Sequence, residues 1–512
     1  MGRLRGLIAP LFCFVAAADA DTLALKDGRF VEGRPVAPAD GGFQVKYDHG
    51  EVFVPAGMVV ECFRESDTGE WAPQTPDEQE KAAKGLAPWK GKWVSKQYRE
   101  SLRKKEFEAR AKRMQEMRDR REWRNRAIVE TKRFVFEHTL PDEIFEDIRD
   151  LFETYYDFFT KYWKIQPNAK FGKPKINIYR DEEYYYQVSG APRGAVGYYS
   201  PMEKELHFFY DWERPRFTID VMFHEGNHML THMVNERVNY PWWINEGMAE
   251  YFGASQWDPV AKAMSIGHLQ SARLAVLQAQ IDDGKWLALD TLLKAPGLDA
   301  IGYAWTWSLC HYLMTNEKYE KAFKKYFLDL GRSNSIKKNS GPLGVRSVDT
   351  ESALDALRRS LKLKDFAQLE KEWHDYVKDN LARRRDDLDF ESAGWMMVIY
   401  GERKAARELL KKAIDKGSRS GYVYHDYARL RLNAGKHDEA KEYAQGAVKF
   451  DPLLARAWSL LGRSMWHLGE REEGMRLLEL ARDMRPDDNQ VWWDYEVTRA
   501  LEQKEKEAAA GG

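Results

Sequence analysis

Four side chains of this 512-residue chain are of the kinds that bind metal ions and move protons, and they lie close together in sequence. His224 and His228 are four positions apart, about one helical turn, so both imidazoles project from one helix face and can hold one ion. Glu225 lies about 100° round the helix from His224, where it can take a proton from a water activated by the metal. The spacing predicts a metal site with a general base.

A second group of residues follows, with the sequence Trp242-Trp243-Ile244-Asn245-Glu246-Gly247-Met248-Ala249-Glu250, and seventeen residues separate His228 from Glu246. In its Trp-x-Asn-Glu-Gly-x-Ala pattern the chain resembles the gluzincins, zinc peptidases that bind the metal through two histidines and a glutamate on a second helix. Within them it is most similar to the aminopeptidase-like branch and to exported bacterial peptidase MA-like proteins. The resemblance covers about residues 130–330.

The resemblance implies a role for each of several residues. Glu246 is the third Zn²⁺ ligand, which leaves the fourth coordination position to water. Glu250, one turn later, accepts a hydrogen bond from the outer ring nitrogen of His224, and Asn245 is a weaker candidate for the same supporting role. Tyr303 is the candidate donor to the developing oxyanion, with an ordinary core aromatic as the alternative.

Two further residues invite a role that their context argues against. His232 continues the stripe of His224 and His228, but ligands on three consecutive turns of a straight helix cannot converge on one ion. The metzincin spacing is also absent, so we expect His232 to be a helix-flank residue or a hydrogen-bond donor to a metal ligand. Glu203 faintly resembles the glutamate that captures a free α-amine in aminopeptidases, yet Ser200-Pro201 before it is ordinary turn chemistry. The sequence leaves exopeptidase and endopeptidase activity open.

Alternating and helical hydrophobic patterns predict the elements that must position this site. We expect strands at 133–137, 175–179, 195–199 and 205–209, of which the last two form a hairpin. Helices are expected at 141–163 and 218–234. One strand of the hairpin should be an edge strand that carries the substrate backbone. Gly226, inside the metal helix, costs about 1 kcal/mol relative to Ala and marks close packing there.

The last 125 residues repeat with a period of 34. The period joins Gly401, Gly435 and Gly469; Ala406, Ala440 and Gly474; Ala413, Ala447 and Ala481; and Pro452 and Pro486. Small residues at a fixed interval let paired helices approach closely. The pattern resembles three tetratricopeptide repeats over about 387–488, with a capping helix at 489–504. Stacked repeats of this kind form a concave face for a protein or peptide, and a packing appendage is the alternative.

The N-terminal segment has the pattern of an export signal. Arg3 and Arg5 precede an apolar run over 7–18, which is too short to span a bilayer comfortably. Cleavage near Ala18 or Ala20 is expected, with a retained anchor as the alternative. The mature protein is therefore predicted to be periplasmic or extracellular, with no membrane span.

Composition and local patterns complete the predicted organisation. The net charge of −1 argues against a nucleic-acid or anionic-membrane binder. We expect a multi-domain α+β protein with a signal peptide (1–20), a small SH3-like β module (21–66), a charged helical linker (67–127), a gluzincin-like zinc peptidase domain (128–385) and an all-α tetratricopeptide solenoid (386–512).

These patterns predict an exported zinc metallopeptidase, with Glu225 as general base and a peptide or protein substrate. The competing hypothesis is a catalytically degenerate scaffold that binds proteins through its repeats. A third possibility is hydrolysis of another amide, such as a cell-wall crosslink.

Overall fold

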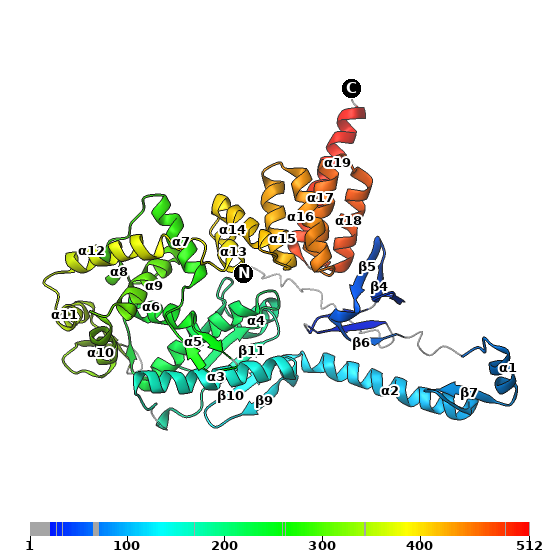
Figure 1. Cartoon of the computed structure of the whole chain (residues 1–512), viewed down its shortest axis with the longest axis horizontal. Coiled ribbons are helices and arrows are strands. Elements are labelled where there is room, and N and C mark those ends of the chain that lie inside the picture. The colour runs from blue at the N-terminus through cyan, green and yellow to red at the C-terminus, as the bar shows by residue number, and fades with distance from the viewer. Residues whose placement is uncertain are drawn as a thin grey trace, which may run out of the picture. The chain divides into compact units, whose positions relative to one another are not determined.

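The computed structural model describes residues 21–510, apart from 27, 33, 65–70, 168, 259, 262, 342–344 and 487. The signal peptide predicted for 1–20 lies outside these residues. The chain divides into two units, 1–118 and 119–512 (Figure 1). Within the described residues, no helix has both the length and the hydropathy needed to cross a membrane.

The first unit begins with six short strands in two three-stranded sheets. One sheet has the order β2-β1-β6, and the other is the meander β3-β4-β5. Their bounds are β1 (Thr22–Leu25), β2 (Phe30–Glu32), β3 (Val36–Ala39), β4 (Gly42–Tyr47), β5 (Gly50–Pro55) and β6 (Val59–Phe63). The predicted short strands are present, and their closure into an SH3-like barrel stays a prediction.

The charged segment that follows holds more structure than the single helix expected from its sequence. It contains α1 (Pro76–Ala83), a hairpin of β7 (Leu86–Trp89) and β8 (Lys92–Ser95), and α2 (Lys96–Arg120). The hairpin turns at Lys90 and Gly91, whose φ angles of 45° and 78° are those of a two-residue turn between twisted strands. Lysine is uncommon at positive φ, so the residue types at these positions do not predict this turn.

The second unit is built on a five-stranded sheet of order β12-β13-β11-β10-β9. The three central strands are parallel, and both edge strands are antiparallel to their neighbours. Their bounds are β9 (Ala127–Glu130), β10 (Val135–His138), β11 (Lys175–Tyr179), β12 (Gly197–Ser200) and β13 (Glu205–Phe209). The predicted hairpin is present as β12 and β13, and β12 forms one edge of the sheet.

Two long helices share the hydrophobic core of this sheet. α3 (Asp142–Trp163) buries Phe152 and Tyr155, and α5 (Pro215–Val234) packs on β12 and β13. The short α4 (Glu182–Ser189) packs through its tyrosines on Tyr179 and Phe209 in a separate cluster. The 3.6-residue pattern of α3 predicted its buried face because residues three or four positions apart lie on the same side of a helix.

Further helices complete the region around α5. They are α6 (Trp242–Gly253), α7 (Ser271–Asp282), α8 (Leu289–Leu293), α9 (Ala300–Thr315), α10 (Glu320–Arg332), α11 (Thr350–Ser360) and α12 (Phe366–Tyr376). Small strands between them are β14 (Val238–Asn239), β15 (Gln256–Asp258), β16 (Ala263–Ser265), β17 (Lys338–Ser340) and β18 (Arg346–Val348). α6 packs against both α5 and α9. A Cβ on Gly247 would lie only 2.5 Å from Cys310 Sγ, so glycine permits the close approach of α6 and α9.

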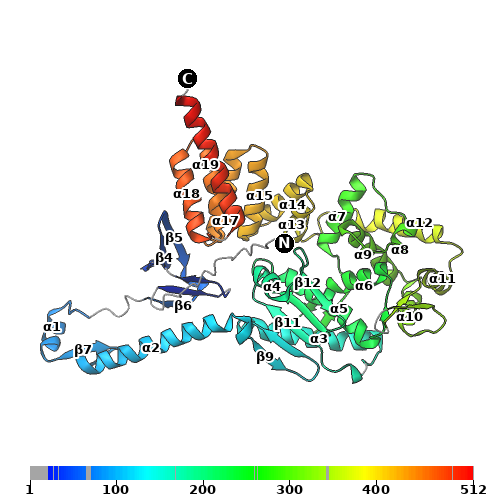
Figure 2. The ribbon, with the colours of Figure 1, turned by 180° about the vertical axis from the view of Figure 1, so that it is seen from behind.

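The C-terminal region is all-helical, as the 34-residue period predicts. Consecutive antiparallel helices lie side by side (Figures 1 and 2). They are α13 (Phe390–Ile399), α14 (Arg403–Asp415), α15 (Gly421–Asn433), α16 (His437–Phe450), α17 (Ala455–His467), α18 (Arg471–Met484) and α19 (Asn489–Ala510). Gly401, Gly435 and Gly469 each follow the first helix of a pair at positive φ, the usual way to end a helix without a Cβ clash.

The first repeat helix also belongs to the core of the preceding helices. α13 packs on α7, and one continuous hydrophobic cluster runs from the sheet to Tyr427 on α15. The Trp395 ring of α13 lies 4.9 Å from the Phe217 ring of α5, centroid to centroid. The first helix pair is therefore joined to the fold that carries α5 by buried apolar contact, and not by a linker alone.

Candidate metal centre

Three side chains from α5 and α6 bring their ligand atoms to the corners of a small triangle. His224 Nε2 and His228 Nε2 lie 3.3 Å apart. Glu246 Oε2 lies 3.3 Å from the first nitrogen and 3.4 Å from the second. Ligands about 2.05 Å from a tetrahedral Zn²⁺ ion are separated by about 3.35 Å, so this donor set fits the ion. Among the described residues, these three form the one such group of histidine, cysteine and carboxylate side chains.

The charges around the triangle favour a cation. Burial disfavours a charge on His224, but its hydrogen bond to Glu246 and the nearby charges of Glu250 and Glu225 outweigh that effect and raise its pKa to about 9. Burial would raise the pKa of Glu246, yet His228 and His224 hold that pKa well below its usual value. Carboxylates buried around two imidazoles are stabilised by added positive charge, which a divalent ion supplies.

The position of α5, which carries the two histidines, is fixed at its N-terminal end and by its packing against α3. Before α5, Asp211 Oδ1 accepts hydrogen bonds from the backbone N–H groups of Glu213 and Arg214 at 3.0 and 2.9 Å. Pro215 then begins the helix, where its missing N–H is not needed. A Cβ on Gly226 would lie 2.9 Å from a ring carbon of Phe152, so this glycine lets α5 lie directly against α3.

A buried ion pair lies behind His224. Glu250 Oε1 lies 3.4 Å from His224 Nδ1, and Arg273 Nη2 donates to the same oxygen at 2.7 Å. The Glu250 side chain is only 3% exposed. The carboxylate expected from the sequence to face His224 therefore does so, and Arg273 of α7 balances its charge. Nδ1 of His228, in contrast, is buried without a hydrogen-bond partner among the described residues.

The remaining predicted residues lie around the triangle. Asn245 Nδ2 donates to Glu246 Oε1 at 3.2 Å, the oxygen that does not face the histidines. The half-buried Tyr303 ring lies 6.4 Å from the His224 ring, centroid to centroid. Burial, followed by the negative charges of Glu246 and Glu250, raises the pKa of Tyr303. Its hydroxyl is therefore a hydrogen-bond donor at neutral pH.

Glu225 faces the edge strand of the sheet. A Cβ built on Gly197 of β12 would lie 3.3 Å from Glu225 Cγ and 2.7 Å from Val221 Cγ1. Gly197 thus lets the strand pass directly over the helix face that holds Glu225. The arrangement places the Glu225 side chain beside the edge strand of the sheet.

His232 has contacts that keep it away from the triangle. Its Nδ1 lies 2.7 Å from the Tyr199 hydroxyl on β12, and its Nε2 lies 2.9 Å from the Glu236 carbonyl oxygen. Nε2 must donate to that carbonyl, so Nδ1 accepts from Tyr199. His232 therefore anchors the edge strand to α5. Glu203 lies exposed in the turn between β12 and β13.

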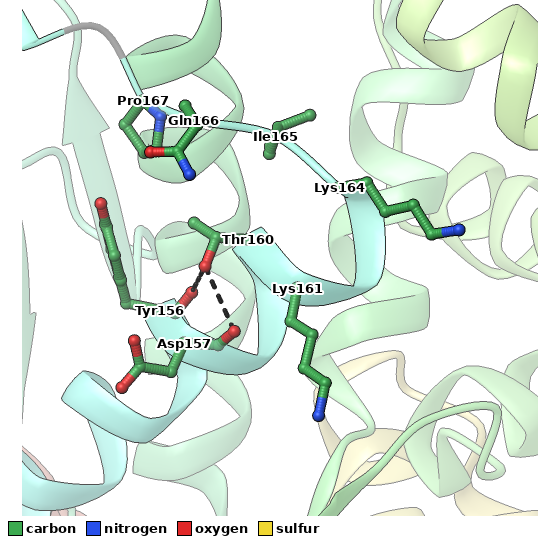
Figure 3. Close-up of a pocket in the computed structure, with 8 residues that line it drawn as sticks. All are labelled: Tyr156, Asp157, Thr160, Lys161, Lys164, Ile165, Gln166 and Pro167. Carbon is green, nitrogen blue, oxygen red and sulfur yellow. Dashed lines mark hydrogen bonds between the residues drawn. The ribbon is translucent and has the colours of Figure 1, made fainter.

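A surface pocket at the C-terminal end of α3 is separate from this site (Figure 3). Its lining includes Asp157, Thr160 and Lys164. It includes none of His224, His228 and Glu246, which we call the metal triangle. Thr160 Oγ1 donates to backbone carbonyls of its own helix at 2.9 and 3.2 Å, and Asp157 pairs with Arg133. These polar groups are occupied in holding the helix end.

Residues 218–337 match the model of a family described as "Protein of unknown function (DUF1570)". The match covers less than half of the chain, and it contains the metal triangle, Arg273 and Tyr303. The description assigns no activity.

Among solved structures, the chain is similar to tetratricopeptide-repeat domains. One is the second such domain of the human RPAP3 protein in complex with an HSP70 peptide, at 18% identity and a TM-score of 0.20, covering 22% of this chain and 92% of that one. Another is that of Sgt2 from Aspergillus fumigatus, at 21% identity and a TM-score of 0.21, covering 24% of this chain and 80% of that one.

Sequence reasoning missed Arg273. It lies 23 positions after Glu250, in a stretch with no motif, and only the packing of α7 brings it to the site. A buried carboxylate at Glu250 does demand a cation, but the sequence does not say which of the 80 lysines and arginines supplies it.

Proposed function

We propose that this protein is a zinc-dependent peptidase, with His224, His228 and Glu246 as metal ligands. The observation that supports this most directly is the triangle of donor atoms with edges of 3.3, 3.3 and 3.4 Å, which fits tetrahedral zinc. When bound, Zn²⁺ polarises a carbonyl group and lowers the pKa of water.

The residues around the metal would then divide the work of hydrolysis. Glu225 accepts the proton from the attacking water and delivers it to the nitrogen of the leaving amine as the C–N bond breaks. Tyr303 donates a hydrogen bond to the carbonyl oxygen as negative charge develops there. Glu250 holds the ring of His224 through its outer nitrogen.

The edge strand suggests how the substrate is held. β12 pairs with β13 on one side, and within the described residues no strand pairs with its other side. An extended peptide can add to that side through backbone hydrogen bonds, which would place its scissile bond near Glu225. Because backbone groups do the pairing, this mode gives broad sequence tolerance.

Zinc analysis and hydrolysis of a peptide library by the mature chain and by Glu225→Gln test the proposal. We expect one zinc per chain in both proteins and a loss of about 10²–10⁴-fold in kcat/KM in the variant, since only the proton transfer is removed. The exposed Glu203→Gln is the matched control and should retain activity. If the zinc-loaded mature chain cleaves no more than zinc-loaded Glu225→Gln on broad peptide panels, the peptidase proposal is refuted.

A second candidate function, a scaffold that binds proteins through its repeats, is favoured by the stacked helix pairs α13–α18. Stacked pairs present an extended surface to a peptide or protein. The two candidates are compatible, because a repeat array can deliver a substrate to the same chain's site. A zinc-free triangle in the purified protein, together with a captured peptide, would favour the scaffold alone.

A further inference from the structure

A chain of polar contacts links the repeat region to the metal triangle. Tyr400, the residue directly after α13, accepts a hydrogen bond from Arg273 Nη1 at 3.4 Å. Arg273 Nη2 donates to Glu250 Oε1 at 2.7 Å. That oxygen lies 3.4 Å from the outer nitrogen of the ligand His224. Three contacts therefore connect a repeat residue with a metal ligand.

Arg273 is the centre of this chain. Its guanidinium carbon lies 5.0 Å from the centre of the Tyr303 ring, besides its contacts with Glu250 and Tyr400. One planar cation thus contacts the supporting carboxylate, the candidate oxyanion donor and the first repeat. Because Glu250 is buried, its charge would lack compensation if Arg273 moved away.

α13, which ends just before Tyr400, is fixed at more than one point against the helices that surround the triangle. The Arg214 guanidinium, just before α5, lies 4.0 Å from the centre of the Trp395 ring. At the start of α13, the backbone N–H of Asp389 donates to Ser271 Oγ at 3.0 Å. The α13 helix and its N-cap residue therefore contact the N-terminal ends of both α5 and α7, and a shift of α13 moves Tyr400 relative to Arg273.

We propose that Arg273 and Tyr400 are positioning residues through which the first repeat helix sets the orientation of the ligand His224. The inference rests on the proposed zinc site and adds to it a residue from outside the matched family region, 218–337. The metal centre is then incomplete without α13.

Zinc affinity of the full-length chain, measured by competition with a chromophoric chelator, tests this proposal. We expect Arg273→Gln to weaken zinc binding about 10–100-fold, the usual cost of losing an outer-sphere partner, and Tyr400→Phe to weaken it about threefold or more. Arg273→Lys should recover part of the loss, since it keeps the charge but not the fork. Tyr427→Phe, on α15, the first helix of the next pair, is the matched control.

A double variant separates positioning from general stability. If Tyr400 acts through Glu250, then Tyr400→Phe should cause no further loss of affinity in a Glu250→Gln background. Cobalt-substituted protein gives a second measurement, since a displaced His224 alters its visible absorption. Circular dichroism of each variant identifies misfolding, and Tyr400→Phe removes only one oxygen.

The outcomes are distinct for the two proposals. Unchanged affinity in a folded Tyr400→Phe, or additive losses in the double variant, would overturn the positioning role. A wild-type protein that binds zinc but cleaves no peptide would overturn the peptidase, while the affinity ratios still decide the role of Tyr400. A wild-type protein that binds no zinc would overturn both.

Discussion

Shortening the third ligand by one methylene gives a sensitive test of the metal triangle. Glu246→Asp keeps the charge but draws the carboxylate back by about 1.5 Å, the length of one C–C bond. Metal–ligand distances tolerate about ±0.2 Å, so the oxygen leaves the triangle unless α6 moves toward α5.

The packing of α6 opposes such a movement. Trp243 is 1% exposed, and its carbonyl accepts a hydrogen bond from the Thr306 hydroxyl of α9. Gly247 also lies directly against Cys310 of α9. A movement of α6 by the missing bond length would separate these buried contacts, so we expect the variant to lose its third ligand and not to adjust.

The expected effect is a fall in zinc affinity of about 100-fold, or about 2.8 kcal/mol. Calorimetric unfolding with and without zinc measures it. At a free zinc concentration 1,000 times the wild-type Kd, zinc should add about 4.1 kcal/mol to the wild-type free energy of unfolding and about 1.4 kcal/mol to that of the variant. Glu203→Asp, at an exposed turn, should behave as wild type. Zinc stabilisation of Glu246→Asp equal to that of the wild type would refute Glu246 as a ligand.

Three further predictions concern the edge strand, acid stability and the repeats. Gly197→Ala should lower kcat/KM at least tenfold without loss of zinc, because the added Cβ would meet Val221 at 2.7 Å and displace β12. Gly297→Ala, where a Cβ meets nothing within 4 Å, is the control. Equal activities of the two variants would contradict the role of β12 in holding the substrate. Burial lowers the pKa of His311 to about 4, so the native state resists its protonation and the free energy of unfolding should fall by up to about 3 kcal/mol as pH drops from about 6.5 to 4. His311→Asn should flatten that part of a pH–stability curve, and an unchanged curve would argue against it. Deleting the chain after residue 386 should expose apolar surface on α7 and lower the melting temperature or the solubility. Ending the chain after residue 417 should preserve the fold. Equal stability of the two shortened chains would contradict a core shared by α7 and α13.

The local features of the site could be predicted from the sequence. A histidine pair one turn apart and the Asn245-Glu246-Gly247 element are each contained within one helix, so their spacing alone places their side chains on defined faces. The repeats were equally accessible, since Gly401, Gly435 and Gly469 each end a helix at the same interval. Both kinds of feature depend only on the spacing of residues along the chain and not on which helices pack together.

The remaining features depend on tertiary packing. Tyr400 reaches Arg273, which pairs with Glu250, only because α7 and α13 pack together, and no periodicity encodes which two helices meet. The Lys90-Gly91 hairpin was missed for a local reason, because lysine is an uncommon residue at positive φ. The helix starts also moved slightly: α5 begins at Pro215 and not at Thr218.

The shared core of α7 and α13 has a consequence for how such a chain can be recombined. A repeat array joined by a linker can be exchanged between proteins at that linker. Here the interval from the start of α13 to the start of α15 is 31 residues, against 34 for the next pair, so the first pair already departs from the regular unit. A recombination point that preserves both parts would therefore fall after α14. The first helix pair would be inherited with the metal-binding fold, while later pairs could be gained, lost or replaced.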